Sequence, residues 1–160
     1  MGLNSTLPWR FSDKSKKLIT SHERLSNLIS NGFHFEACAV QGTIIEALLF
    51  FSILGATGEK TTEESSKIRY KLSSLTLGGL ILRARKYSLL DPLIINQIDN
   101  FKKKRNFFVH HHLVELHDFD YESTLSEGNT LITSLLEHVR EKVHSQMKAI
   151  GHKDADKFKD

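Results

Sequence analysis

The sequence predicts an all-α protein with about five helices. Apolar residues recur at intervals of three and four rather than in alternation, which is the spacing of one helix face. Only two prolines, Pro8 and Pro92, interrupt the 160 residues. The composition, 39% hydrophobic and 26% charged, is that of an ordinary globular chain. A single domain of this length buries a core without needing a disulfide or a metal.

We divide the chain into three parts. Residues 1–12 are a predicted N-terminal arm, residues 13–150 a helical domain, and residues 151–160 a polar C-terminal tail. Ser12 and Asp13 are favoured N-cap residue types. We therefore expect the first helix to begin there.

The second predicted helix is the central one. The first helix runs to about Ser30, because Asn31 and Gly32 supply a stop signal. The following segment, about residues 33–54, is apolar nearly all round, which is typical of a helix surrounded by other helices. Its apolar run over residues 43–56 is too short to span a bilayer. We therefore expect a core helix and no membrane partner.

Two shorter helices are expected next. Thr61 and Glu64 have the spacing of a capping box, which predicts a polar helix over about residues 61–72. A short helix is then expected over about residues 76–87, with Gly78 and its neighbouring glycine near its start. Small residues there allow another helix to approach closely.

The clearest helix start in the chain is Asp91–Pro92. An N-cap residue followed by proline at the first helical position favours a helix beginning there, and we expect it to reach about Leu113. Residues 114–123 are predicted to be a loop. A last helix then runs to about Ile150.

The single cysteine and the net charge indicate which cellular compartment and which kind of partner to expect. Cys38 has no partner for an intrachain disulfide, and no signal peptide is recognisable, so we expect a reducing, cytoplasmic setting. Cys38 lies in an apolar segment, which favours an inert core thiol. The formal net charge of +3 permits an anionic partner without requiring one.

Arg105 interrupts the apolar stripe of the fifth predicted helix. The stripe follows core-facing spacing and consists of Ile94, Ile98, Phe101, Arg105 and Phe108. A cation there needs a partner or a phosphate, because burying it unpaired costs several kcal/mol. Glu46 is a lone carboxylate in the apolar second helix and could pair with Arg105 across the bundle. A buried structural ion pair is therefore one interpretation of both residues.

The same residues also suit RNA cleavage without a metal. In that reaction the 2′-hydroxyl attacks the adjacent phosphate, and His is the side chain suited to moving protons near neutral pH. Arg can stabilise the charge that develops on the phosphate, and Asn106 could orient either group. His110 lies four residues after Asn106 on the same face, but about 140° around the helix from Arg105. The two meet at one site only if Arg105 reaches around or a second subunit contributes.

Three lysines precede this motif and offer an RNA-binding surface. Lys102, Lys103 and Lys104 would attract a phosphate backbone electrostatically. The alternative interpretation is a solvated helix face.

The segment Arg105–Asn106–x–x–x–His110 resembles the Arg-x(4–6)-His motif of the HEPN superfamily (higher eukaryotes and prokaryotes nucleotide-binding domain). In that family a polar residue, often Asn, follows the Arg. The context is similar over roughly residues 13–150 in helix order, since an apolar helix with the acidic Glu46 comes earlier and an amphipathic helix follows.

The resemblance implies an up-and-down helical bundle that forms a homodimer, with two motifs facing one cleft. Many members are metal-independent endoribonucleases of toxin–antitoxin, abortive-infection or other antiviral defence systems, which implies RNA as substrate and an antitoxin or defence protein as partner. By position, Arg105 would stabilise the phosphate, His110 would act as acid or base, Asn106 would orient them, and Glu46 would orient Arg105.

The resemblance also has limits. One branch of the family carries a Tyr two residues after the motif His, as a target of AMPylation, whereas this chain has His112. Regulation by that route is therefore not expected. Some members are inactive binding or dimerisation modules, so a non-catalytic module that binds a nucleotide, RNA or a protein is the alternative function.

A zinc site and a cofactor are not expected. Consecutive helical residues point about 100° apart, so three of them cannot bind one ion. His111 and Glu115 have suitable spacing, but no third ligand is evident. The potential ligands in this region are His110, His111, His112, His117, Asp118 and Asp120.

Overall fold

The all-α class is confirmed by a computed structural model, which describes residues 9–56, 62–111 and 119–149. These residues form six helices and no strand. Each helix corresponds to one of the predicted segments, although the expected total was about five. The helices are α1 (Trp9–Ser30), α2 (His34–Ala56), α3 (Thr62–Ser73), α4 (Leu77–Lys86), α5 (Pro92–His111) and α6 (Tyr121–Ala149).

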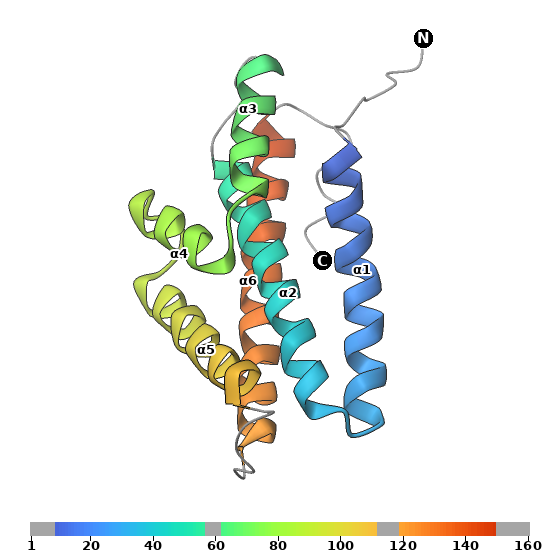
Figure 1. The fold of residues 1–160 in the computed structure, drawn as a ribbon. Helices are drawn as coiled ribbons and strands as arrows, with labels where there is room; N and C mark the ends of the chain where they lie inside the picture. The colour runs from blue at the N-terminus through green and yellow to red at the C-terminus, as the bar shows by residue number, and fades with distance from the viewer. Residues whose placement is uncertain (1–8, 57–61, 112–118, 150–160) are drawn as a thin grey trace.

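Helix α2 is the centre of the bundle. It contacts each of the other five helices, and its most extensive contact is with α6. Figure 1 shows α1, α2 and α6 as three long, roughly aligned helices, with α1 running antiparallel to α2 and α6 parallel to it. The shorter α4 and α5 pack on the side of α2 and α6 away from α1, and α5 runs back toward the start of α2 (Figure 1).

The apolar composition of α2 explains its central position. Nearly half of its residues are buried on several sides of the helix, including Ile45, Leu49 and Ile53, which are wholly inaccessible. The apolar run over residues 43–56 is too short by itself, but the whole of α2 is, alone among the described helices, long and apolar enough to cross a membrane. Even so, 61% of its most apolar window is buried inside the bundle. Burial by neighbouring helices is the behaviour of a core helix.

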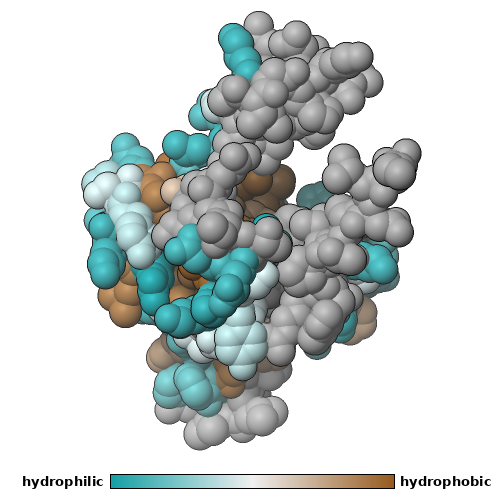
Figure 2. All heavy atoms as spheres, turned by 90° about the horizontal axis from the view of Figure 1, so that it is seen from above, coloured by the Kyte–Doolittle hydropathy of each residue, from teal (hydrophilic) through white to brown (hydrophobic). Residues whose placement is uncertain are grey.

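The surface seen in Figure 2 is mixed. Hydrophilic and hydrophobic residues alternate over the described part of this end of the molecule. Scattered apolar side chains of this kind are normal on a globular protein.

The end of α1 follows the predicted stop signal. Gly32 adopts a left-handed φ of +76°, and the Phe33 amide donates a 2.9 Å hydrogen bond to the Leu28 carbonyl. This six-to-one bond is the closing bond of a Schellman cap, in which glycine is favoured because it has no Cβ to clash.

The start of α1 differs from the prediction. The helix begins at Trp9, so Ser12 and Asp13 lie inside it rather than capping it. Cap preference is only one term in helix formation, and proline is favoured close to a helix start, which Pro8 satisfies in the sequence. The other predicted boundaries agree with the structure to within a few residues, where the residues are described.

Helix α5, which carries the motif, begins as predicted. The Leu93 amide donates a 2.7 Å hydrogen bond to Asp91 Oδ1, and Pro92 occupies the first helical position. This cap fixes the start of the helix and hence the register of the residues that follow it. The predictions made for residues 1–8, Thr61, His112, His117, Asp118 and 151–160 fall outside the described residues.

Candidate functional site

The apolar stripe of α5 places Arg105 against α2. Ile98 and Phe101 are completely buried and Phe108 nearly so, whereas Arg105 is half-buried. The predicted interruption of an apolar face by a cation is therefore present in the structure. Its cause is the helical spacing of the stripe, which points Arg105 the same way as its apolar neighbours.

A glycine on α2 makes room for the Arg105 side chain. A Cβ added at Gly42 would lie 2.7 Å from both Cδ and Nη1 of Arg105, closer than real Cβ contacts. Any larger residue would therefore push the arginine away. Gly42 was not identified from the sequence, although a glycine within an apolar helix is a signal of close approach.

One hydrogen bond holds the guanidinium group. Arg105 Nη2 donates to Asn106 Oδ1 at 2.9 Å. Arg105 Nε is buried and has no hydrogen-bond partner among the described residues. A guanidinium group has five N–H donors, so most of the donor capacity of Arg105 is not used by the described residues.

The Arg105–Glu46 ion pair is not formed within the described structure. Glu46 is half-buried and lies one helical turn after Gly42 on α2, but no salt bridge joins it to Arg105. The structural ion pair that the residue types allow is therefore absent. Glu46 lies one helical turn away from Gly42, the residue against which the guanidinium group of Arg105 packs.

The imidazole of His110 faces solvent on the same helix. His110 is exposed, whereas Arg105 lies half-buried against α2, and no hydrogen bond joins the two residues within the described structure. This agrees with their five-residue separation, which turns them about 140° apart. A single chain in this conformation thus does not bring the two side chains together.

The three lysines of α5 form salt bridges within the chain. Lys102 and Lys103 lie 2.8 and 3.2 Å from the Asp99 carboxylate, and Lys104 pairs with Glu127 of α6. Hydrogen bonding to Lys102 is the main reason that the pKa of Asp99 lies below its ordinary value, and Lys103 adds to the effect. Asp99 was not identified from the sequence, although its spacing of three and four from two lysines was a usable signal.

The described residues include no group of side chains that could hold a metal ion. His111 packs on the Phe107 ring, with centroids 4.3 Å apart. Over residues 9–56, 62–111 and 119–149, no three His, Cys, Asp or Glu side chains are close enough to hold a metal ion. Burial raises the pKa of the Cys38 thiol to about 11, which keeps it protonated at neutral pH.

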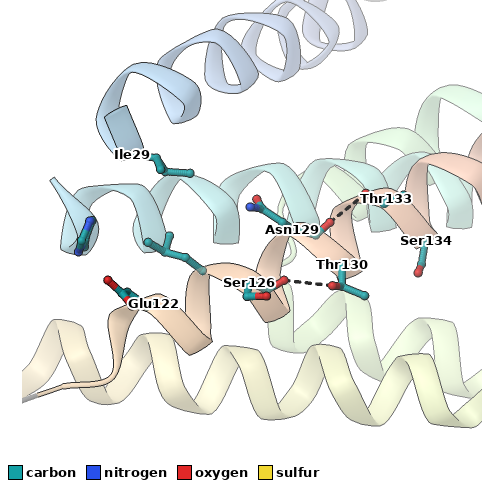
Figure 3. A pocket seen from close by; sticks show the side chains of 9 residues that line it. Ile29, Glu122, Ser126, Asn129, Thr130, Thr133 and Ser134 are labelled. Carbon is teal, nitrogen blue, oxygen red and sulfur yellow. Dashed lines mark hydrogen bonds between the residues drawn. The ribbon is translucent and has the colours of Figure 1, made fainter. Parts of the chain in front are cut away.

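Two pockets open elsewhere on the described surface, and neither is lined by the motif residues. One, of about 630 Å³, lies between α6 and the α1–α2 turn, and Figure 3 shows hydroxyl and amide side chains of α6 along it, among them Ser126, Asn129 and Thr130. The other, of about 390 Å³, lies between α2, α3 and α4 and is mainly apolar, although Lys71 and Arg83 are also among its lining residues.

Comparison with known proteins adds no identification. No protein-family model matches the chain, and no curated protein or solved structure matches it.

Proposed function

We propose that this protein is a HEPN-type endoribonuclease that cleaves RNA without a metal. The observation that carries the proposal is the state of Arg105. Its guanidinium group is held by Asn106, leaves most donors unused by the described residues, and lies on the helix that exposes His110. An arginine with one fixed bond and spare donors is suited to binding a phosphate.

The proposed chemistry is a transfer within the RNA strand. The 2′-hydroxyl oxygen attacks the neighbouring phosphorus, and the bond from phosphorus to the 5′-oxygen breaks. The products are a 2′,3′-cyclic phosphate and a 5′-hydroxyl. His110 takes the 2′-hydroxyl proton or supplies a proton to the leaving oxygen, while Arg105 stabilises the charge on the phosphate. Glu46 is a weaker proposal, as an orienting partner for Arg105.

A homodimer would complete this site. Within one chain Arg105 lies against α2 while His110 is exposed. In a symmetric pair, the arginine of one subunit could meet the histidine of the other, and one of the two histidines could act as base and the other as acid. The resemblance to HEPN proteins also implies a cytoplasmic defence or toxin role, with an antitoxin or defence protein as partner.

The test is RNA cleavage by the purified protein in EDTA, with the product ends analysed. We expect cyclic phosphate ends from the wild type, and cleavage lower by about 10²- to 10⁴-fold for His110→Ala and Arg105→Ala. His22→Ala is the matched control, because His22 is also an exposed helical histidine. Circular dichroism and gel filtration would establish that each variant is folded. Wild-type cleavage by His110→Ala would contradict the proposal.

The second candidate function is a non-catalytic module that binds a nucleotide, RNA or a protein. It is favoured by one observation, namely that the buried side of Arg105 packs on Gly42 as a structural residue would. In that case the wild type shows no turnover, and Arg105→Ala lowers the melting temperature or the affinity for the ligand.

A further inference from the structure

Positive charge is concentrated in α4 and α5. These two helices contain a single carboxylate, Asp99, although the whole chain has a net charge of only +3. Packing of α4 on α5 therefore gathers a positive surface that the short lysine run by itself does not reveal. Their cations are Arg83, Arg85, Lys86, Lys102, Lys103, Lys104 and Arg105.

Three of these cations converge on Asp99. Lys102 Nζ lies 2.8 Å, Lys103 Nζ 3.2 Å and Arg85 Nη2 3.9 Å from the carboxylate oxygens. We call these four residues the Asp99 cluster. One negative charge cannot neutralise three positive charges, so the cluster keeps a net positive charge. Arg85 comes from a different helix, so only the tertiary structure assembles the cluster.

The cluster has capacity left for a ligand. The side chains of Arg85 and Lys103 are 44% and 68% exposed, whereas that of Asp99 is 17% exposed. Arg85 Nη2 also donates to Asn96 Oδ1 at 3.2 Å, which helps to orient the guanidinium group. The carboxylate thus lies beneath two cations that face solvent.

The cluster is aligned with the proposed active site. Lys103, Asn106 and His110 are spaced by three and four residues and share one face of α5. At a rise of about 1.5 Å per residue, Lys103 lies roughly 10 Å along the helix from His110. A strand bound at the Asp99 cluster can therefore run toward His110 along a single helix face.

We propose that the Asp99 cluster binds the phosphate backbone of single-stranded RNA, with Arg85 of α4 as a contact. This inference rests on the proposed function for its choice of RNA. It adds a second phosphate site to the one proposed at Arg105 and extends the binding surface from α5 to α4. Asp99 holds the cations in place and competes with the phosphate for them.

The test measures binding without turnover. A fluorescein-labelled single-stranded RNA is titrated with the His110→Ala protein, and anisotropy gives Kd at several salt concentrations. We expect Arg85→Gln to raise Kd by about 3- to 10-fold and to reduce the slope of log K against log salt by about 0.7, the value for one lost phosphate contact. Arg24→Gln is the matched control, because Arg24 is an exposed cation on α1.

A second substitution should act in the opposite direction. Asp99→Asn frees the cations from their competitor, so we expect Kd to fall by about threefold or more. Glu23→Gln on α1 makes the same change in net charge at an exposed position away from the cluster. The inference is overturned if Arg85→Gln weakens binding no more than Arg24→Gln does. It is also overturned if Asp99→Asn tightens binding no more than Glu23→Gln does.

These outcomes separate the two proposals. The expected changes in Kd without any cleavage by the wild type would support the RNA surface and contradict the ribonuclease. Cleavage by the wild type with Kd unchanged in Arg85→Gln would support the ribonuclease and overturn the RNA surface.

Discussion

Helix α2 makes two contacts in which a polar side chain packs onto a glycine, and the two contacts differ in the hydrogen bonds that the polar side chain makes. Toward α6, Gln41 of α2 is packed against Gly128 and is wholly buried. Toward α5, the arrangement is reversed, since Gly42 of α2 receives Arg105. The two glycines serve the same purpose of bringing a polar group close to the opposite helix.

The difference lies in the hydrogen bonds. Gln41 Nε2 donates across the helix contact to the Leu125 carbonyl at 2.7 Å and to Asn129 Oδ1 at 2.9 Å. Arg105 bonds only to its own neighbour, Asn106, among the described residues. The hydrogen bonds of the Gln41 amide stabilise the packing of α2 on α6. The half-buried guanidinium group of Arg105 keeps N–H donors that can bind an anion.

The largest expected effect is on stability at the α2–α6 contact. A Cβ at Gly128 would lie 2.2 Å from Gln41 Oε1, and the amide is wholly buried and hydrogen-bonded to α6, so moving it would break those bonds. We expect Gly128→Ala to lower the free energy of unfolding by about 2 kcal/mol, which is about 4 to 8 °C in Tm for a chain of this size. Thermal unfolding followed by circular dichroism measures it.

The control for this substitution is another helical glycine. A Cβ at Gly78 would meet its nearest atom at 3.7 Å, an ordinary contact, so Gly78→Ala should leave Tm unchanged or slightly raised. Equal Tm values for the two variants would show that Gln41 is not held tightly at Gly128.

The next effect concerns activity at the α2–α5 contact. Gly42→Ala should displace Arg105, because the added Cβ would lie 2.7 Å from its Cδ and Nη1. The arginine is flexible and alanine favours helix, so we expect Tm to stay within about 2 °C of the wild type. RNA cleavage should nevertheless fall by about tenfold, because the phosphate-binding group is misplaced.

The outcome of Gly42→Ala shows whether the contact between Arg105 and Gly42 serves function or stability. Full cleavage activity in this variant would show that the position of Arg105 on Gly42 has no functional role. A large decrease in Tm would instead show that the α2–α5 contact stabilises the fold, as the contact of Gln41 with α6 does.

The smallest effect is a pH dependence at Asp99. Its pKa lies below the ordinary 3.8, chiefly through the hydrogen bond from Lys102. The stabilisation is therefore present above about pH 4 and is lost as the pH falls through the lowered folded-state pKa. At neutral pH we expect Asp99→Asn to lower Tm by only about 1 to 2 °C, because ion pairs whose cations face solvent contribute little. The difference from wild type should shrink as the pH falls below the ordinary pKa of Asp and disappear once it lies below the lowered folded-state pKa. A difference that stays constant over this range would contradict the assignment.

Residue type and spacing along the chain were enough to predict the helices and several of their ends. The Asp91 cap, the left-handed Gly32 and the apolar composition of α2 were all readable before the structure, and so was the position of Arg105 on an apolar stripe. These features depend on interactions between residues about four positions apart, which residue type and spacing specify directly.

The groups that meet across helices could not be predicted in this way and are set by the packing of the bundle. This packing placed Arg105 on Gly42 rather than in an ion pair with Glu46, and it brought Arg85 of α4 to Asp99 of α5. Such contacts depend on the angle and separation at which two helices pack, and many distant side chains set these together. A sequence pattern along one helix shows which face is buried but does not show which residue of another helix lies opposite.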